Sequence, residues 1–395
     1  MVAGRTREAG FPPPTYPRKA VRKSGGGTDR AVREAGARRR NRELVSHLVE
    51  SGVLTDPAVK AAFEAVLRHQ FLPGRRLAYV YEDTAIPTKT NEQGIALSSS
   101  SQPAIMALML QELGLEPGQR VLEIGTGTGY NAALIRRLVG DAGLICSLEI
   151  DEEVCNQARA NLAAAGVEGV QVICGDGARG CPESAPFQRA IVTAGVSDLA
   201  PAWIDQLAEG GRLVTPLSLA GPLQLCVAFL KRGPTLSSQS LSACGFLPLR
   251  GEMAFEGPTG ALNPVERPLA LPGHPTWASV PAADVRGGFE LWLALTEPDY
   301  VRLRLSEEDP PVFGVADERG AALAVPERDG FWIYAYGPAD EATARLIEAH
   351  QRWAVRRPRP RDLQLSAYPA GEEPAVEPDQ LVVRRPHFTF LVTQP

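Results

Sequence analysis

Residues 121–130 read VLEIGTGTGY, and this stretch decides the fold. The apolar run up to the turn, QRVLEIG, predicts a buried strand, and the run after it, YNAALIRRLVG, predicts a helix. Gly125, Gly127 and Gly129 lie between the two, where glycine allows a tight turn and a close approach of the backbone to a ligand. The stretch therefore predicts a strand, a ligand-binding turn and a helix in succession.

Strands and helices alternate after this turn. The predicted strands are GLICSLEID, VQVICGDG, FQRAIVTAG and GRLVTPLS, and the helices between them are EEVCNQARANLAAAG and LAPAWIDQLAEGG. Upstream, RNRELVSHLVESG and TDPAVKAAFEAVLRHQF predict two more helices. Such alternation is typical of a parallel sheet with helices on both faces. We expect a doubly wound, Rossmann-like α/β domain over residues 41–251.

The pattern changes near residue 250. Residues 252–280 are rich in Pro and Gly and predict a linker. Beyond it, FELWLAL, YVRLRL, DGFWIYAYG and HFTFLV predict strands, and ADEATARLIEAHQRWAVRR predicts a helix. We expect a smaller α+β domain over residues 281–395, a candidate peptide-binding unit. Residues 1–40 are basic and rich in Pro and Gly, which predicts a disordered tail.

Composition narrows the classes of function. The 395 residues carry a net charge of −5 and six cysteines. The cysteines form no C-x-x-C pair, so we expect reduced thiols in a cytoplasmic protein and no metal site. No apolar run reaches the ~20 residues that span a bilayer, which argues against a membrane partner. The chain after the basic tail is acidic and has no Asn-Pro-Pro-Tyr-type segment for a flipped base, which argues against nucleic acid.

Two acidic residues follow the next two predicted strands. Glu149 comes 24 positions after Gly125, where a carboxylate can accept hydrogen bonds from both ribose hydroxyls. Asp176 ends the following strand and can bind an adenine amino group. Because the carboxyl ends of parallel strands meet at one edge of the sheet, these residues predict an adenosine-binding site.

The glycine spacing distinguishes between adenosine ligands. Tyr130 stands where the G-x-G-x-x-G motif of NAD-binding proteins has its last glycine. ATP binding at such a turn needs a G-K-[ST] segment whose lysine contacts phosphates, and the turn has none. S-adenosylmethionine has no phosphates and needs neither feature. An NAD-dependent dehydrogenase and a binding module without catalytic activity remain the alternatives from other classes.

Several segments, most of them outside the glycine turn, resemble protein-L-isoaspartate O-methyltransferases. RHQFLPG, AYVYEDTAIP, SQPAIMALML, VLEIGTGTGYNAAL, CGDGARG, APFQRAIVTAG and QLAEGGRLVTPL occur in the order typical of that family, within about residues 41–251. The resemblance implies a class I methyltransferase fold and S-adenosylmethionine as the cofactor. It also implies a peptide or protein acceptor that carries Asp or isoAsp.

The resemblance implies the residues of the site as well. Cofactor contacts are expected from Glu123, Gly125, Thr126, Gly127, Gly129, Glu149, Ile150, Asp176, Gly177 and Thr193. The acceptor is expected beside Ser98, Ser99, Gln102 and Pro103, with Ser101 and then Ser100 as the catalytic residues. A carboxylate is ionised at neutral pH, so it is already a nucleophile and needs neutral donors for orientation rather than a general base.

Two features depart from compact members of that family. The segment IALSSSSQP, residues 95–103, is longer and richer in hydroxyl groups than the family's Thr-Ile-Ser-Gln-Pro-like segment, and about 140 residues follow residue 251. Both features resemble extended members associated with lanthipeptides and graspetides, which methylate an aspartate of a ribosomally made, modified peptide. The ester then closes through a succinimide to isoaspartate or aspartimide. We expect such peptide tailoring, with general isoaspartyl repair as the alternative.

Overall fold

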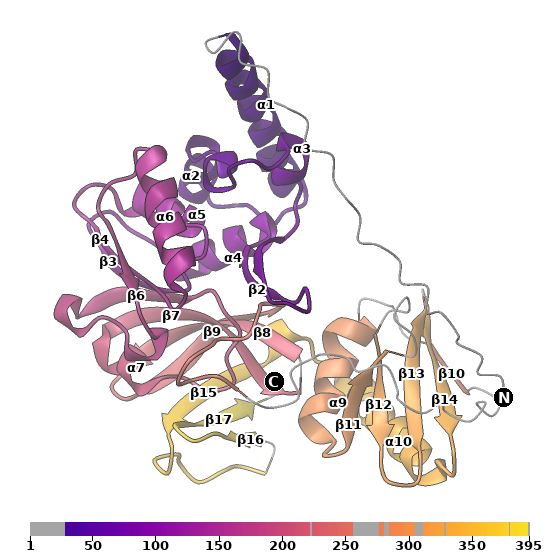
Figure 1. Ribbon diagram of the computed structural model, residues 1–395. Helices are drawn as coiled ribbons and strands as arrows, with labels where there is room; N and C mark the ends of the chain where they lie inside the picture. The colour runs from indigo at the N-terminus through magenta and orange to yellow at the C-terminus, as the bar shows by residue number, and fades with distance from the viewer. Residues whose placement is uncertain are drawn as a thin grey trace, which may run out of the picture.

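The computed structural model of the protein (Figure 1) describes residues 28–221, 223–255, 276–279, 284–304, 311–327, 329–378 and 380–393. A ten-stranded sheet, a five-stranded sheet and a two-stranded hairpin organise these residues. Within these ranges, no helix combines the length and the apolar character needed to cross a bilayer.

The ten-stranded sheet has a parallel half and an antiparallel half. Its order is β16-β17-β15-β9-β8-β7-β6-β3-β4-β5, and the strands from β7 to β5 run parallel. The parallel strands are β3 Arg120–Ile124, β4 Leu144–Glu149, β5 Val170–Cys174, β6 Phe187–Val192 and β7 Leu207–Ala220. The antiparallel half begins with β8 Leu223–Arg232 and β9 Thr235–Cys244. From β3 the chain adds β4 and β5 on one side, and it then crosses to the other side of β3 to add β6 and β7. This reversal of the strand order confirms the predicted doubly wound class.

Helices cover both faces of the parallel half. Those that contact the sheet are α4 Pro103–Leu113, α5 Tyr130–Val139, α6 Glu152–Ala164 and α7 Pro201–Gln206. The outer helices are α1 Thr28–Glu50, α2 Pro57–Ala65 and α3 Leu77–Val80, of which α1 packs on α2 and α3 (Figure 1). Val121 of β3 packs in the core that includes Leu134 of α5, whereas its neighbour Leu122 packs in the opposite core with Trp203 of α7. Because β3 is buried on both faces, its sequence is almost continuously apolar.

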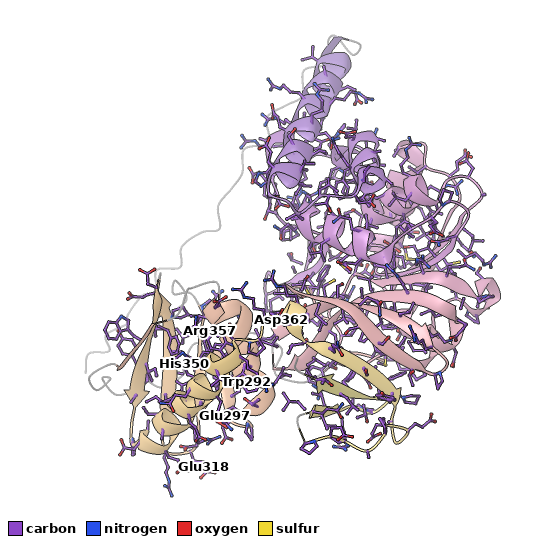
Figure 2. The ribbon with its side chains drawn as sticks, turned by 180° about the vertical axis from the view of Figure 1, so that it is seen from behind. Trp292, Glu297, Glu318, His350, Arg357 and Asp362 are labelled. Carbon is purple, nitrogen blue, oxygen red and sulfur yellow. A yellow bond between two sulfur atoms is a disulfide. The ribbon has the colours of Figure 1, made fainter. Side chains whose placement is uncertain are left out.

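A second sheet forms a separate unit beside the large one. Its order is β10-β14-β13-β12-β11, all antiparallel. Its elements are β10 Thr276–Ser279, α9 Glu290–Thr296, β11 Tyr300–Leu303, β12 Val312–Ala316, β13 Ala321–Glu327, β14 Gly330–Tyr336 and α10 Asp340–Arg356. Phe289 and Phe331 stack with ring centroids 5.3 Å apart, and the ring of His350 of α10 (labelled in Figure 2) meets both edge-on, with centroids 5.2 Å from each. This inserted unit therefore has its own aromatic core.

The last strands of the chain return to the large sheet. β15 Gln364–Pro369 pairs with β9, and β17 Phe388–Thr393 lies between β15 and β16 Gln380–Arg384. The second unit is therefore an insertion, and the predicted single domain over residues 281–395 is wrong in its boundary. The alternation of HFTFLV predicted the strand correctly, but local alternation does not identify the partner strand.

The segment FELWLAL forms the end of a short π-helix and α9, so the predicted strand is wrong. Phe289 and Leu293 pack in the core of the inserted unit, whereas Leu291 and Leu295 pack against the core of the large sheet. Each pair has the i, i+4 spacing of a helix face. A helix buried on two opposite sides thus imitates the alternation of a strand.

Helix α1 begins at Thr28, inside the stretch predicted to be disordered. Its buried side includes Ala37 and Leu44, and Asn41 donates a hydrogen bond to the Phe63 carbonyl at 2.9 Å. Part of the stretch predicted to be disordered is therefore helical, and Ala37 joins it to the core, which the composition did not indicate. The rest of the predicted tail, residues 1–27, lies outside the described residues.

The position of β17 generates a stability prediction. Phe390 is fully buried in the core of the large sheet, and Phe331 is fully buried in the core of the inserted unit. We expect Phe390→Ala to lower the free energy of unfolding by about 3–5 kcal/mol and to increase amide hydrogen exchange in β7, β8 and β9. Phe331→Ala should cost a similar amount but increase exchange only in β12, β13 and β14. Mass spectrometry of exchanged peptides measures both effects, and exchange changes confined to β15–β17 in the first variant would contradict the shared core.

Candidate functional site

The glycine turn after β3 is in direct contact with two other segments. Gly125, Gly127 and Gly129 have φ values of 98°, 53° and 84°, a region that favours glycine. A Cβ atom at Gly125 would collide with the Thr193 hydroxyl, and one at Gly127 would lie 3.3 Å from the Ser99 carbonyl oxygen. The turn therefore requires glycine both for its backbone conformation and for this close approach.

A separate hairpin carries three of the four serines, and the fourth follows it directly. It consists of β1 Ile86–Thr90 and β2 Ala96–Ser100, which pair antiparallel and, in the described part of the chain, join neither larger sheet. The contact between Ser99 and Gly127 places β2 against the glycine turn. Both segments line one cavity of about 1060 Å³. This volume exceeds the usual range of ~300–1,000 Å³ for a pocket that holds one small ligand, so it leaves room for a second ligand.

Most of the predicted site residues line this cavity. They are Ser98, Ser99, Ser100, Ser101, Gln102, Gly125, Thr126, Gly127, Glu149, Ile150, Gly177 and Thr193. Four others lie outside the lining: Pro103, Glu123, Gly129 and Asp176. The structure thus brings the serine segment and the predicted cofactor residues together, while the role of each residue stays a prediction.

A buried arginine anchors the serine segment. Arg68 is fully buried, and its guanidinium donates hydrogen bonds to the carbonyl groups of Ser100 at 3.3 Å and Ser101 at 2.9 Å. The same group donates to the carbonyls of Val80, at 2.9 Å, and of Glu82 and Thr84. Sequence reasoning missed Arg68, because its partners lie in segments that only the fold brings together.

Two buried hydroxyl groups in the cavity wall have no hydrogen-bond partner among the residues that the structure describes. They belong to Ser100 and Tyr130, which are 3% and 1% exposed. Burial raises the pKa of Tyr130, so this phenol stays neutral. Because buried polar groups are normally paired, these hydroxyls are candidate donors to a bound ligand. The sequence signalled Tyr130 only as a departure from the NAD motif.

Glu149 ends β4 at the cavity. Its carboxylate accepts hydrogen bonds from the amides of Gly127 at 3.0 Å and Asp151 at 3.2 Å. Arg250 reaches over it, with 3.7 Å between the nearest guanidinium nitrogen and carboxylate oxygen. Glu149 thereby links the glycine turn to the segment that follows β9, and it remains 8% exposed toward the cavity.

Asp176 caps the turn after β5 and contacts the same segment after β9. It accepts hydrogen bonds from the amides of Ala178 at 2.9 Å and Glu252 at 2.7 Å. Its neighbour Gly177 lines the cavity, whereas Asp176 does not. The ends of β4 and β5 therefore both lie beneath residues 250–252.

Glu123 lies behind the glycine turn and is fully buried. Burial raises its pKa to about 7, although hydrogen bonds from Ser147 and Asn131 favour the carboxylate. The negative charge of Glu149 raises this pKa further. Asn131 and Ser147 occupy its two oxygens, so Glu123 supports the turn from inside the fold.

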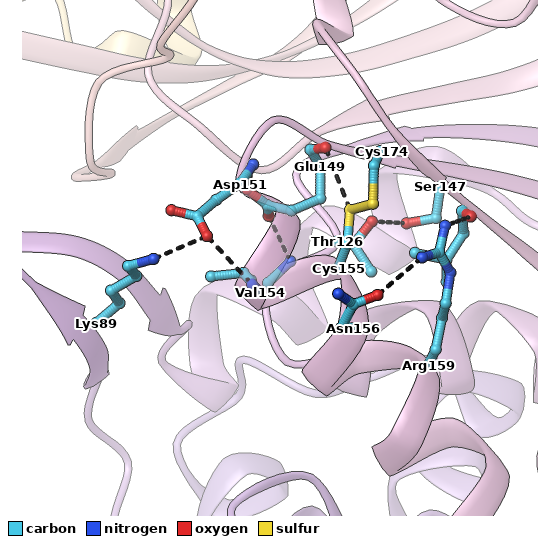
Figure 3. Close-up of a disulfide and its surroundings, with 12 residues drawn as sticks. Lys89, Thr126, Ser147, Glu149, Asp151, Val154, Cys155, Asn156, Arg159 and Cys174 are labelled. Atoms are coloured by element: carbon cyan, nitrogen blue, oxygen red, sulfur yellow. Dashed lines mark hydrogen bonds and ion pairs between the residues drawn. A yellow bond between two sulfur atoms is a disulfide. The ribbon is translucent and has the colours of Figure 1, made fainter.

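A lysine connects the hairpin to the helix beside Glu149. Lys89 of β1 lies 2.9 Å from an Asp151 oxygen and 2.7 Å from a Glu153 oxygen. Figure 3 shows Lys89 pointing to Asp151 at the start of α6, next to Glu149. Arg68 therefore holds the hairpin at Ser100 and the chain directly after it at Ser101, while Lys89 holds β1.

The predicted reduced state is wrong for two of the cysteines. Cys155 of α6 and Cys174 of β5 form a disulfide with Cα atoms 6.0 Å apart (Figure 3). The two residues are 19 positions apart without a C-x-x-C pattern, so only the packing of α6 on β5 brings them together. The other four are free thiols, as predicted: Cys146, Cys181, Cys226 and Cys244.

The raised pKa of Glu123 generates a pH prediction. Its ordinary value is 4.5, so between about pH 4.5 and 7 the unfolded chain binds fewer protons than the folded chain, and the free energy of unfolding falls as pH rises. Glu123→Gln should remove this dependence. Its free energy of unfolding relative to that of the parent should therefore increase between pH 5 and 8, by up to about 3 kcal/mol. Urea unfolding at several pH values measures the difference. An exposed control, Glu168→Gln, should show none, and a pH-independent difference for Glu123→Gln would contradict the assignment.

Comparison with known proteins shows the family of the chain. The family model described as protein-L-isoaspartate(D-aspartate) O-methyltransferase matches residues 39–254. A protein-L-isoaspartate O-methyltransferase from Methanoculleus marisnigri is 37% identical over 222 residues, which cover 56% of this chain and 96% of that protein. The enzyme of the same name from Thermotoga maritima is 40% identical over 197 residues, which cover 49% of this chain and 61% of that protein.

A solved structure extends the similarity beyond the methyltransferase domain. A protein-L-isoaspartate O-methyltransferase structure matches with a TM-score of 0.51 and 29% identity, and the match covers 82% of this chain and 96% of that chain. Residues 39–254 alone cannot account for a match of this extent, so part of the C-terminal extension has a counterpart there. The family model covers more than half of the chain, and the chain therefore belongs to the protein-L-isoaspartate O-methyltransferase family.

Proposed function

We propose that the protein methylates an aspartyl side-chain carboxylate in a ribosomally made, modified peptide. The observation that carries the methyl transfer is the contact between the serine strand and the glycine turn, where a Cβ atom on Gly127 would lie 3.3 Å from the Ser99 carbonyl oxygen. Acceptor and methyl donor can therefore meet in one cavity without a movement of either element. The choice of acceptor rests on the hydroxyl-rich segment 95–103 and on the extension after residue 251. The reaction is a carboxyl O-methyl transfer.

The methyl donor is S-adenosylmethionine, the cofactor of the family to which the chain belongs. The residues present fit it, because the backbone of the glycine turn lines the cavity and the Glu149 carboxylate lies at the adjacent strand end. When bound, the cofactor supplies an electrophilic methyl group on sulfur. We assign Gly125, Gly127 and Glu149 to hold it, with Ile150 and Thr193 on the same wall.

The serine segment would orient the acceptor. The acceptor carboxylate is ionised at neutral pH and attacks without a general base. Ser100 and Ser101 offer neutral hydroxyl groups, which can aim one carboxylate oxygen while leaving the other free to attack. A cationic donor at this point would stabilise the ionised ground state and so reduce nucleophilicity. Arg68 fixes the backbone of both serines, which supplies the alignment that a proximity-driven transfer needs.

Esterification prepares the next step in the peptide. Methanol leaves a neutral ester much more easily than oxide leaves a carboxylate. The nitrogen of the following amide can then attack the ester carbonyl, lose its proton and close a succinimide, with methanol as the leaving group. Hydrolysis opens this ring to Asp or isoAsp, whereas a ring that persists is an aspartimide.

Repair of isoaspartyl residues is the second candidate. The relatives reported above carry the name protein-L-isoaspartate O-methyltransferase, and the solved structure shares part of the C-terminal extension. The two candidates differ in the acceptor, so a pair of peptides with Asp or isoAsp at the same position distinguishes them. A mass gain of about 14 Da on the Asp peptide, followed by loss of methanol, supports tailoring; modification of the isoAsp peptide alone supports repair and contradicts tailoring.

Cofactor choice gives a further prediction. S-adenosylhomocysteine at 100 times its dissociation constant should raise the free energy of unfolding by about 2.7 kcal/mol, whereas NAD should have no effect. Glu149→Gln should weaken this stabilisation, because the amide accepts fewer hydrogen bonds from ribose hydroxyls. Thermal unfolding with each ligand measures both effects. Stabilisation by NAD would instead favour the dehydrogenase alternative.

The role of the serines gives another prediction. Ser101→Ala should lower kcat about 10- to 100-fold, the effect of losing one hydrogen bond to a charged group, and Ser100→Ala should have a similar effect. The dissociation constant for S-adenosylhomocysteine should stay unchanged in both variants. Steady-state kinetics and calorimetry measure the two quantities, with the exposed Ser51→Ala as a control. Equal losses of turnover and cofactor affinity would indicate misfolding rather than a contact with the acceptor.

A further inference from the structure

The inserted unit contributes a charged side chain to the wall of the cavity. Arg302 lies on β11 and lines the same cavity as the serine segment and the glycine turn. In the described part of the chain, the carboxylate and guanidinium groups that line this cavity belong to Glu149, Arg250 and Arg302. Glu149 and Arg250 pair with each other at 3.7 Å. Of the three charged groups, Arg302 is the one that comes from the inserted unit.

The inserted unit is seated firmly against the methyltransferase domain at this point. Leu291 of α9 is 6% exposed and packs in the core of the large sheet. At the turn between β7 and β8, a Cβ atom on Gly221 would lie 3.1 Å from the ring of Tyr300. These contacts place β11 at a defined position beside the cavity, so Arg302 belongs to its wall.

A buried carboxylate holds the Arg302 guanidinium in place. Glu290 is 3% exposed, and one of its oxygens lies 2.9 Å from Arg302 Nε and 3.1 Å from the Tyr300 hydroxyl, which donates a hydrogen bond to it. The side chain of Arg302 itself remains 28% exposed. The ion pair is with Nε, and no residue that the structure describes accepts a hydrogen bond from the two terminal nitrogens, which form a planar pair of donors that suits a carboxylate.

We infer that Arg302 binds a second carboxylate of the acceptor peptide, distinct from the one that is methylated. This inference rests on the proposed function and names a specificity determinant for it. The methylated carboxylate needs the neutral donors of the serine segment, whereas an acidic group elsewhere in the peptide gains from a guanidinium. An enzyme that selects one ordinary aspartate needs such a contact away from the reacting atoms. The second carboxylate comes from an acidic side chain or from the C-terminus of the peptide.

Binding of three labelled peptides to the full-length protein tests the inference. Each is a fluorescein-labelled nonapeptide with one central Asp. The first has two Glu on each side of the Asp and an amidated C-terminus, the second has Gln in place of Glu, and the third is the Gln peptide with a free C-terminus. Fluorescence anisotropy in the presence of S-adenosylhomocysteine measures affinity. We expect the Glu peptide to bind about tenfold more tightly than the Gln peptide at low salt, an effect typical of one charge-assisted contact.

The variants separate a binding role from a structural one. Arg302→Gln should remove most of the preference for the Glu peptide and leave binding of the Gln peptide and of S-adenosylhomocysteine unchanged. The double variant Glu290→Gln/Arg302→Gln, which removes both charges of the ion pair, should behave in the same way. Arg302→Lys should retain part of the preference. Arg352→Gln, an exposed arginine of α10 in the same unit, is the matched control and should bind like the parent.

The outcomes distinguish this inference from the proposed function. The inference is wrong if the parent binds the Glu and Gln peptides equally well and gains nothing from the free C-terminus. It is also wrong if the preference for the Glu peptide persists in Arg302→Gln and in the double variant. A gain for the third peptide alone assigns the contact to the chain terminus. A third outcome is a preference that depends on Arg302 but no mass gain when S-adenosylmethionine replaces S-adenosylhomocysteine. It would support the binding of a carboxylate by Arg302 and contradict the methyl transfer.

Discussion

The close approach of Ser99 to Gly127 is the contact on which the site depends. A Cβ atom on Gly127 would lie 3.3 Å from the carbonyl oxygen of Ser99. The φ of 53° at Gly127 also lies in the left-handed region that favours glycine. A bulkier turn would push the hairpin away and separate the two halves of the cavity. Proximity catalysis tolerates little displacement of this kind, since misplacement by about 1 Å can cost about 100-fold in rate.

The hairpin needs external anchors, because it belongs to neither larger sheet in the described part of the chain and a two-stranded hairpin is marginally stable alone. Arg68 supplies one anchor by donating hydrogen bonds to five carbonyl groups from a buried position. Lys89 supplies the second by pairing with Asp151 at the start of α6. The hairpin that carries the serine segment is therefore tied to the strand end that carries Glu149.

The extension after the methyltransferase domain has two physical roles. Its last strands complete the large sheet, so Phe390 shares a core with Phe229 of β8. Its inserted unit has a separate aromatic core and adds Arg302 to the cavity wall. Part of this extension has a counterpart in a solved isoaspartate methyltransferase, so length alone does not distinguish peptide tailoring from repair. The distinction depends on which carboxylate the cavity accepts.

The sequence by itself determined the parallel sheet, the glycine turn, Glu149 at the strand end and the serine segment, because each of these depends on local periodicity or on the conformational freedom of glycine. It misassigned FELWLAL, since a helix buried on both sides repeats apolar residues as a strand does. Only the tertiary structure decided the carbonyl partners of Arg68, the disulfide between Cys155 and Cys174, the pairing of β15 with β9 and the place of Arg302. These features join segments far apart in the chain, and the physical reason is that long-range packing, not local sequence, decides which segments meet.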